Sequence, residues 1–298
     1  MMLVVGLGEV LWDLFPEGKQ LGGAPANFAY ITNLLGDRGI IASRVGHDAL
    51  GSEIQERLGT LGLEASYLQS DSARPTGTVR VRVDQDGQAR FEITDMVAWD
   101  FLEWTPAWES LAQQADAICF GSLAQRSPAS RETIHKFLGA ARPGTARIFD
   151  VNLRQAFYSA KVLSESLKFA DIAKLNAEEL PRVVELLGIP HHGEQPSAER
   201  LRFAYGLKLV CVTRGAQGSL LVSEFERHEH PGFRVQVADT VGAGDAFTAA
   251  LVHHFLRGAG LAAMNEAANR IGAWVASCVG ATPSSDDVQL RRILATTA

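Results

Sequence analysis

Apolar and polar residues follow two different rhythms along the chain. Short apolar runs, typical of buried strands, lie at 3–11, 39–46, 116–122, 146–152, 171–176 and 208–215. Longer segments with apolar residues at helical spacing lie at 24–36, 49–62, 246–260 and 265–280. Strands that alternate with helices form right-handed βαβ units. The pattern therefore predicts an α/β fold with a mostly parallel sheet that helices cover on both faces.

Residues 76–93 depart from this rhythm. Their valines alternate strictly with charged residues, and Asp86-Gly87 is a strong signal for a hairpin turn. The segment is expected to form antiparallel β structure within a parallel α/β protein. From the pattern alone it is either an edge hairpin or a lid or oligomerisation flap.

Composition excludes several classes of function. The chain has 298 residues, a formal net charge of −6 and no run of Lys and Arg, which argues against a nucleic-acid partner. Its apolar stretches fall short of the ~20 residues that span a bilayer. The N-terminal segment lacks the pattern of a signal peptide and is better explained as a buried strand. We expect a protein with neither a membrane nor a nucleic-acid partner.

The cysteines and one histidine pair predict no metal or disulfide chemistry. Cys119, Cys211 and Cys278 have apolar neighbours and no CxxC spacing, so we expect inert core thiols in the reducing cytoplasm. His191-His192 lies in a polar segment with no acidic or cysteine partner nearby, and a solvated loop is expected there.

The segment DTVGAGDAF at 239–247 carries the strongest chemical signal. Gly242 and Gly244 allow close approach to a ligand just before a helix, where amides and the helix dipole favour an anion. A carboxylate at Asp245 fits if an acceptor hydroxyl lies between it and a phosphate, because Asp245 can then take the proton. The alternative is a plain N-cap aspartate after a tight turn.

A second glycine-rich segment, LGGAPANFA at 21–29, opens another helix. Gly22 and Gly23 let backbone amides approach a polyol, and Asn27 offers both a donor and an acceptor. The known nucleotide fingerprints are missing: GLGEVL lacks the third glycine of a dinucleotide site, and no GxxxxGK[ST] occurs. A dehydrogenase is therefore disfavoured.

GGAPAN and DTVGAGD together resemble the two signatures of the PfkB, or ribokinase-like, sugar kinases. GEVLWD, DVNLR, KLNAEEL and VTRGAQGS also resemble motifs of that family in its order. The resemblance covers essentially the whole chain and implies one domain, 1–298, with a three-layer α/β/α sandwich. It also implies a small β-sheet lid, formed by about 9–17 and 75–98, which closes on the sugar and in many members joins two subunits into a homodimer.

The resemblance assigns roles residue by residue. Asp245 is implied as the general base, and the amides of Gly242, Ala243 and Gly244 as the anion hole. The residues implied to hold the sugar are Asp13, Gly22, Gly23, Asn27 and Arg154.

The cofactor and nucleotide positions follow from the same resemblance. Asn176 and Glu179 are implied to place Mg²⁺ through water, since that ion keeps much of its hydration shell. Part of the family also binds a monovalent cation such as K⁺, and Asp239 and the carbonyl of Val241 are the matching positions. The residues implied to line ATP are Thr213, Gly215, Gly218 and Asn269.

The resemblance is strongest to fructokinases and implies ATP-dependent phosphorylation of a ketose at its primary hydroxyl, fructose to fructose 6-phosphate. Ribokinases carry Lys where this chain has Ala24. Kinases of 2-keto-3-deoxygluconate share Arg154 but commonly carry an Arg just after the hairpin, which this chain lacks. That kinase, another sugar or nucleoside kinase of the family and a catalytically silent sensor are the alternatives. Trp12 and Trp99 are expected either to stack on a sugar face or to pack in the core.

Overall fold

The computed structural model describes residues 1–16, 18–83 and 89–297. Within them, nine strands form the main sheet in the order β13-β12-β11-β10-β9-β8-β1-β4-β5. Neighbouring strands from β11 to β5 are parallel, whereas β12 and β13 are added in antiparallel fashion at one edge. The strands are β1 Leu3–Leu7, β4 Arg38–Gly46, β5 Leu68–Asp71, β8 Ala117–Gly121, β9 Ala146–Asp150, β10 Ile172–Asn176, β11 Leu209–Thr213, β12 Ser219–Val222 and β13 Arg227–His230.

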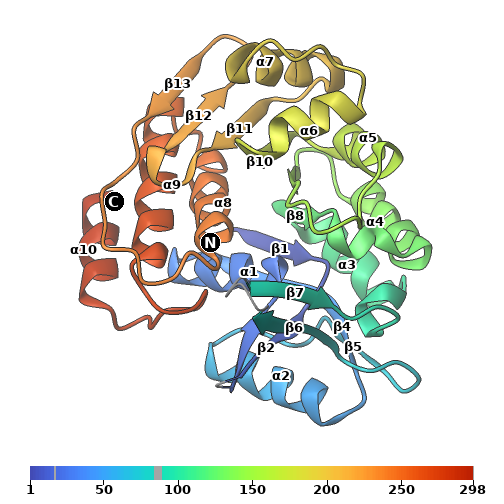
Figure 1. The fold of residues 1–298 in the computed structure, drawn as a ribbon. Coiled ribbons are helices and arrows are strands. Elements are labelled where there is room, and N and C mark those ends of the chain that lie inside the picture. The colour runs from blue at the N-terminus through green and yellow to red at the C-terminus, as the bar shows by residue number, and fades with distance from the viewer. Residues whose placement is uncertain (17, 84–88, 298) are drawn as a thin grey trace.

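Helices cover both faces of this sheet (Figure 1). One layer holds α1 Ala24–Leu34, α2 Ala49–Thr60, α8 Ala243–Phe255, α9 Leu261–Ala276 and α10 Val288–Thr297. The other layer holds α3 Pro106–Gln114, α4 Pro128–Ala140, α5 Ala160–Phe169, α6 Glu179–Leu186 and α7 Glu194–Tyr205. Short 3₁₀ turns connect elements at Ala98–Phe101, Leu123–Arg126 and Gly215–Gln217. The predicted α/β/α sandwich is confirmed.

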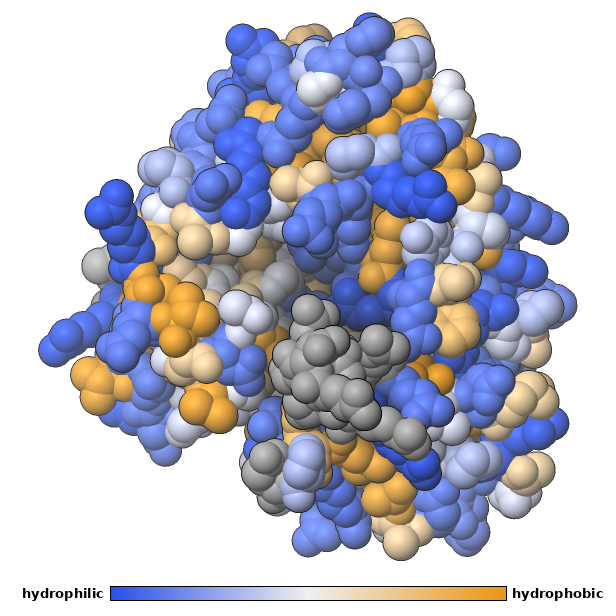
Figure 2. Space-filling model, in the orientation of Figure 1, coloured by the Kyte–Doolittle hydropathy of each residue, from blue (hydrophilic) through white to orange (hydrophobic). Residues whose placement is uncertain are grey.

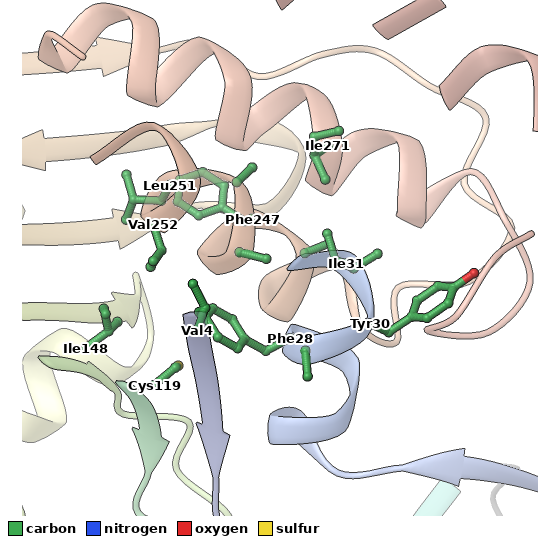
Figure 3. Close-up of a cluster of buried hydrophobic side chains, with 14 of the residues drawn as sticks. Val4, Phe28, Tyr30, Ile31, Cys119, Ile148, Phe247, Leu251, Val252 and Ile271 are labelled. Carbon is green, nitrogen blue, oxygen red and sulfur yellow. The ribbon is translucent and has the colours of Figure 1, made fainter. Parts of the chain in front are cut away.

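Alternation along the buried strands builds two hydrophobic cores. Val4 faces the layer of α1, α8 and α9, and its neighbour Val5 faces the layer of α3 to α7, because successive side chains of a strand point to opposite faces. Figure 3 shows the first core, where Phe28 of α1 and Phe247 of α8 lie together with Val4. Packing of α1 against α8 therefore joins the two glycine-rich segments in space.

A second, small sheet lies at one end of the molecule, beside α2 (Figure 1). Its order is β3-β2-β6-β7, from β2 Leu11–Phe15, β3 Gly18–Gly22, β6 Gly77–Val83 and β7 Ala89–Ile93. The β2–β3 and β6–β7 pairs are antiparallel, and β2 pairs with β6 in parallel. The predicted strands of the hairpin are thus present, while the predicted turn at Asp86-Gly87 lies outside the described residues.

The expectation of one strand over 3–11 is wrong. β1 ends at Leu7, Gly8 takes a φ of 148°, and β2 of the small sheet begins at Leu11. The chain changes sheets here, although its apolar character continues, because both segments are buried. The small sheet also includes β3, beyond the boundary expected at residue 17.

The structure describes the surface and the environment of the cysteines. The face seen in Figure 2 is mostly hydrophilic, with hydrophobic residues in small separate groups. Among the described residues, no helix has the length and apolar character needed to span a membrane. Cys119 and Cys211 are buried as expected, whereas Cys278 is only partly buried.

Candidate active site

The strand order of the main sheet reverses beside β1. The chain runs from β1 to β4 and β5 on one side, and continues from β8 on the other side. Ligands of open α/β sheets bind at the carboxyl ends of the strands at such a switch point. A small cavity opens there, lined by Ala24, Pro25, Phe28, Cys119, Phe120, Gly121, Asp150 and Asp245.

Asp245 and Asn27 meet in this region. Asp245 lies in the first turn of α8, and the Asn27 side-chain amide donates a 2.8 Å hydrogen bond to its Oδ2. Asn27 is buried, and its Oδ1 has no hydrogen-bond partner among the described residues. Oδ1 of Asn27 is therefore available to accept a ligand hydroxyl, while the amide holds the Asp245 carboxylate in place.

The environment of Asp245 favours a base that works near neutral pH. Burial raises the pKa of Asp245 to about 6, and the nearby Asp150 carboxylate contributes in the same direction. The Asn27 hydrogen bond and the charges of Lys174 and Arg154 oppose this rise in pKa. Such a carboxyl is ionised at pH 7 and accepts a proton more readily than an ordinary aspartate does.

The GAGD turn has the shape expected of an anion site. Gly242 takes a φ of 78°, which favours glycine, and a side chain there would overlap Ala281. The first amides of an α-helix have no partner within the helix. One difference from the expected anion hole is that the Ala243 amide donates a 3.3 Å bond to the Thr240 carbonyl, so Gly242 and Gly244 offer the freer amides.

Asp13 lies at the junction with the small sheet. It is on β2, beside β3, and a side chain in place of Gly22 would overlap its carboxylate. Gly23 is the N-cap of α1. Burial raises the pKa of Asp13 to about 6, and Arg154 opposes this rise. The structure thus brings Asp13 close to Gly22 of the first glycine-rich segment and within electrostatic reach of Arg154.

Glu9 is a residue that the sequence analysis missed. It lies between β1 and β2, is 4% exposed, and its Oε2 has no hydrogen-bond partner among the described residues. Burial raises the pKa of Glu9 to about 7, with Arg154 lowering it and Asp245 raising it further. Arg154 itself is exposed and within electrostatic reach of Glu9, Asp13 and Asp245. The signal was the charged residue in the otherwise apolar segment GLGEVL.

The predicted magnesium residues sit at the ends of adjacent elements. Asn176 ends β10 and accepts hydrogen bonds at Oδ1 from the Glu178 and Glu179 amides. Glu179 accepts from the Leu153 amide at Oε1 and from the Asn176 amide at Oε2, both at 2.8 Å. Each carboxylate oxygen keeps a further lone pair, so Glu179 can still accept from a metal-bound water. Burial raises the pKa of Glu179.

Thr213 is the partner of Asn176 across the sheet, which places the predicted nucleotide strand next to the predicted metal residues. Gly215 and Gly218, with φ of 58° and 82°, shape the turn that follows. Asn269 is buried on α9, and its amide nitrogen donates to Ser219 Oγ and to Asn265. Its assignment to the nucleotide remains a prediction.

Asp239 closes the turn before α8. Its carboxylate accepts from the amides of Val241 at 3.0 Å and Gly280 at 3.1 Å. The role of Asp239 and Val241 with a monovalent cation remains a prediction. Among the described residues, no group of three or more His, Cys, Asp or Glu gathers as a metal site.

The two tryptophans pack in the protein. Trp99 is fully buried with Arg126 over its ring at 4.1 Å, and Trp12 is 6% exposed and donates from Nε1 to the Leu50 carbonyl. Packing is therefore the better of the two explanations for both rings.

A larger groove lies elsewhere, between α7 and the β12–β13 turn, where Phe203 and Phe225 are exposed. None of the residues that line it was predicted to carry chemistry, so size alone does not identify the active site.

Comparisons with known proteins identify the family and the fold. The sequence model described as "pfkB family carbohydrate kinase" matches residues 16–288. A fructokinase of Escherichia coli is 33% identical over 261 residues, which cover 83% of this chain and 82% of the relative.

Solved structures extend the likeness to the whole fold. An uncharacterized sugar kinase from Pyrococcus horikoshii in complex with ATP has a TM-score of 0.81 and 29% identity, covering 98% of this chain and 100% of that one. A fructokinase double mutant from Vibrio cholerae with fructose, ADP and a potassium ion has a TM-score of 0.81 and 25% identity, covering 98% and 97%.

Proposed function

Because the chain belongs to the pfkB family of carbohydrate kinases, we propose that this ATP-dependent kinase phosphorylates the primary hydroxyl of a ketose, with fructose as the substrate. The observation that carries the proposal is the Asn27–Asp245 hydrogen bond at the switch point of the sheet. It joins a segment suited to a polyol with a segment suited to a phosphate. The likeness to fructokinases supports fructose in particular.

In the proposed reaction, Asp245 Oδ1 accepts the proton of the sugar hydroxyl while Oδ2 stays bonded to Asn27. The hydroxyl oxygen forms a bond to the γ-phosphorus of ATP as the bond to ADP breaks, and the helix N-terminus at Gly242 and Gly244 stabilises the negative charge that develops. Asn176 and Glu179 would hold Mg²⁺ through water, and the ion would neutralise phosphate charge. Thr213, Gly215, Gly218 and Asn269 would line the nucleotide.

The charges around the cavity favour a neutral sugar over a sugar acid. Glu9, Asp13 and Asp245 are all carboxyl groups, and Arg154 is the cation that acts on all three. A carboxylate on the substrate would add a further negative charge to this group. A polyol instead offers hydroxyl donors to the unpaired oxygens of Glu9 and Asn27.

Three further parts of the proposal concern the setting of the enzyme. K⁺ would bind at Asp239 and the carbonyl of Val241, as the potassium-bound fructokinase suggests. The small sheet would act as a lid and join two copies into a homodimer. The use of ATP together with free thiols fits the cytoplasm.

The decisive experiment is ADP release measured with fructose, ribose, 2-keto-3-deoxygluconate, tagatose and nucleosides. We expect the highest kcat/KM with fructose. A marked preference for the keto acid would replace the proposed substrate within the same family, whereas ADP release that no sugar stimulates would favour a silent sensor.

A further inference from the structure

A buried ion pair lies directly beneath the GAGD turn. Lys174 of β10 and Asp150 of β9 are register partners, and Lys174 Nζ lies 3.1 Å from both carboxylate oxygens of Asp150. Lys174 is 7% exposed and Asp150 is 3% exposed. Removing two charges from water is costly, and the mutual attraction of a buried pair often does not exceed this cost. The pair is therefore weak evidence for a purely stabilising role.

Two contacts connect this pair to the turn. The Thr248 hydroxyl lies 2.9 Å from both Asp150 Oδ2 and the Gly244 carbonyl. A Cβ atom built on Gly244 would lie 3.1 Å from Lys174 Nζ. The ammonium group thus sits against Gly244, the residue before Asp245, and the absence of a side chain on Gly244 leaves room for it.

We propose that Lys174 is a positioning residue for phosphoryl transfer: its ammonium group, held by Asp150 against Gly244, supplies the positive charge that keeps the Asp245 carboxylate ionised. The proposal rests on the proposed function, in which Asp245 is the base. In this proposal Lys174 acts through Asp245 and the turn and does not contact the sugar.

The charged groups around Asp245 come from several elements. Asp150 of β9 lines the same cavity as Asp245 and raises the pKa of Asp245. Lys174 of β10 and Arg154 of the loop after β9 lower the pKa of Asp245. Glu9, which follows β1, is coupled to Asp245 as well.

Two more groups complete this electrostatic environment. Cys119 of β8 is a neutral thiol, because burial raises its pKa well above the ordinary value. Glu179 of α6 acts on Lys174. Burial is the largest single influence and would lower the pKa of Lys174, but the carboxylates of Asp150, Asp245 and Glu179 together raise it, so the lysine stays charged. Lys174 is therefore the buried cation that balances the carboxylates nearest the turn.

The test compares the pH dependence of kcat between variants that change the charge of this pair. It is measured at saturating sugar and ATP, so that the proposed sugar-binding carboxyls are already in contact with substrate. Lys174→Met removes the positive charge. The acid limb of the kcat profile, where activity falls as Asp245 takes up a proton, should move up by about one to two pH units, with a loss of activity at pH 7. Asp150→Asn removes the opposing charge and should move the limb down. The double variant should lie between the two single variants.

Thr248→Val is the matched control, because it removes a hydrogen bond from the same cluster without changing its charge. We expect its acid limb to stay at the wild-type position even if its turnover falls. Equal limbs in wild type, Lys174→Met and Asp150→Asn would overturn the proposal while leaving the kinase activity intact. Loss of all sugar-dependent ADP release in the wild type would instead contradict the proposed function.

A second readout needs no catalysis and covers variants that fold but do not turn over. Wild type and each variant are compared with the same protein carrying Asp245→Asn, and the difference in Tm within each pair is measured as a function of pH. The midpoint of that difference reports the ionisation of Asp245. It should move upward in Lys174→Met, and an unmoved midpoint would overturn the proposal. If Lys174→Met alone fails to fold, the double variant is compared with Asp150→Asn. These two differ only in the Lys174 charge, so the midpoint should be higher in the double variant, and equal midpoints would overturn the proposal.

Discussion

The two sides of the cavity differ in how completely their polar groups are paired. On the side of the GAGD turn, Lys174 and Thr248 both bond to Asp150, and all three residues are almost fully buried. On the side proposed to hold the sugar, Glu9 Oε2 and Asn27 Oδ1 have no partners among the described residues, and Arg154 is exposed. The first side is organised before any ligand arrives, whereas the second has bonding capacity that a polyol would satisfy. Changes on the first side should therefore alter kcat, and changes on the second side should alter KM.

The largest effect is expected at Asp245, on the preorganised side. Asp245→Asn keeps the shape and the bond from Asn27 but removes the base, so kcat should fall at least ~10²-fold with little change in the KM for ATP. Steady-state kinetics checks this, with Asp286→Asn, an exposed carboxyl, as the control. Near-normal turnover would remove Asp245 from the mechanism.

A smaller effect is expected at Arg154, on the side proposed to hold the sugar. Arg154→Met removes a charged hydrogen-bond donor, which is typically worth ~1.5–3 kcal/mol. The sugar KM should rise roughly 10- to 100-fold while kcat stays within a few-fold. Arg200→Met, at the distant groove, is the matched control for losing one arginine. A fall in kcat alone would assign Arg154 to the preorganised side.

The smallest effect is on stability and depends on pH. The pKa of Asp245 rises from 3.8 to about 6 on folding, so its ionisation destabilises the folded state as pH increases through this window. Asp245→Asn should therefore raise Tm by a few degrees at pH 7 to 8 and have no such effect below pH ~4. Calorimetry at the two pH values checks this. A gain in Tm that is equal at both would show that the carboxylate is not desolvated.

Much of this arrangement follows from the sequence alone. Periodicity predicted the layers and the hairpin strands, and the glycine-rich segments predicted Asn27 and Asp245. The end of β1 could not be predicted, because Gly8 redirects a run that is apolar on both sides of the bend. Local pattern reports burial but not which sheet a strand joins.

The pairing of Lys174 with Asp150 also required the structure. Both residues lie within predicted strands, yet their contact depends on the register of two strands separated by α5. Glu9 was missed for a related reason, because its environment is made by Arg154 and Asp245, which are distant in the chain. Spacing within a motif reveals local geometry, while charge balance in a cavity depends on tertiary contacts.

The bond between Asn27 and Asp245 spans 218 residues of chain. During synthesis on the ribosome, a nascent polypeptide can form β1, α1 and the small sheet long before α8 leaves the exit tunnel. Such an incomplete product lacks both the proposed proton acceptor and the proposed phosphate-binding helix terminus, so under this mechanism it would not consume ATP. Under the proposed mechanism, catalytic competence thus arrives only after synthesis has passed α8 and this helix has packed against α1.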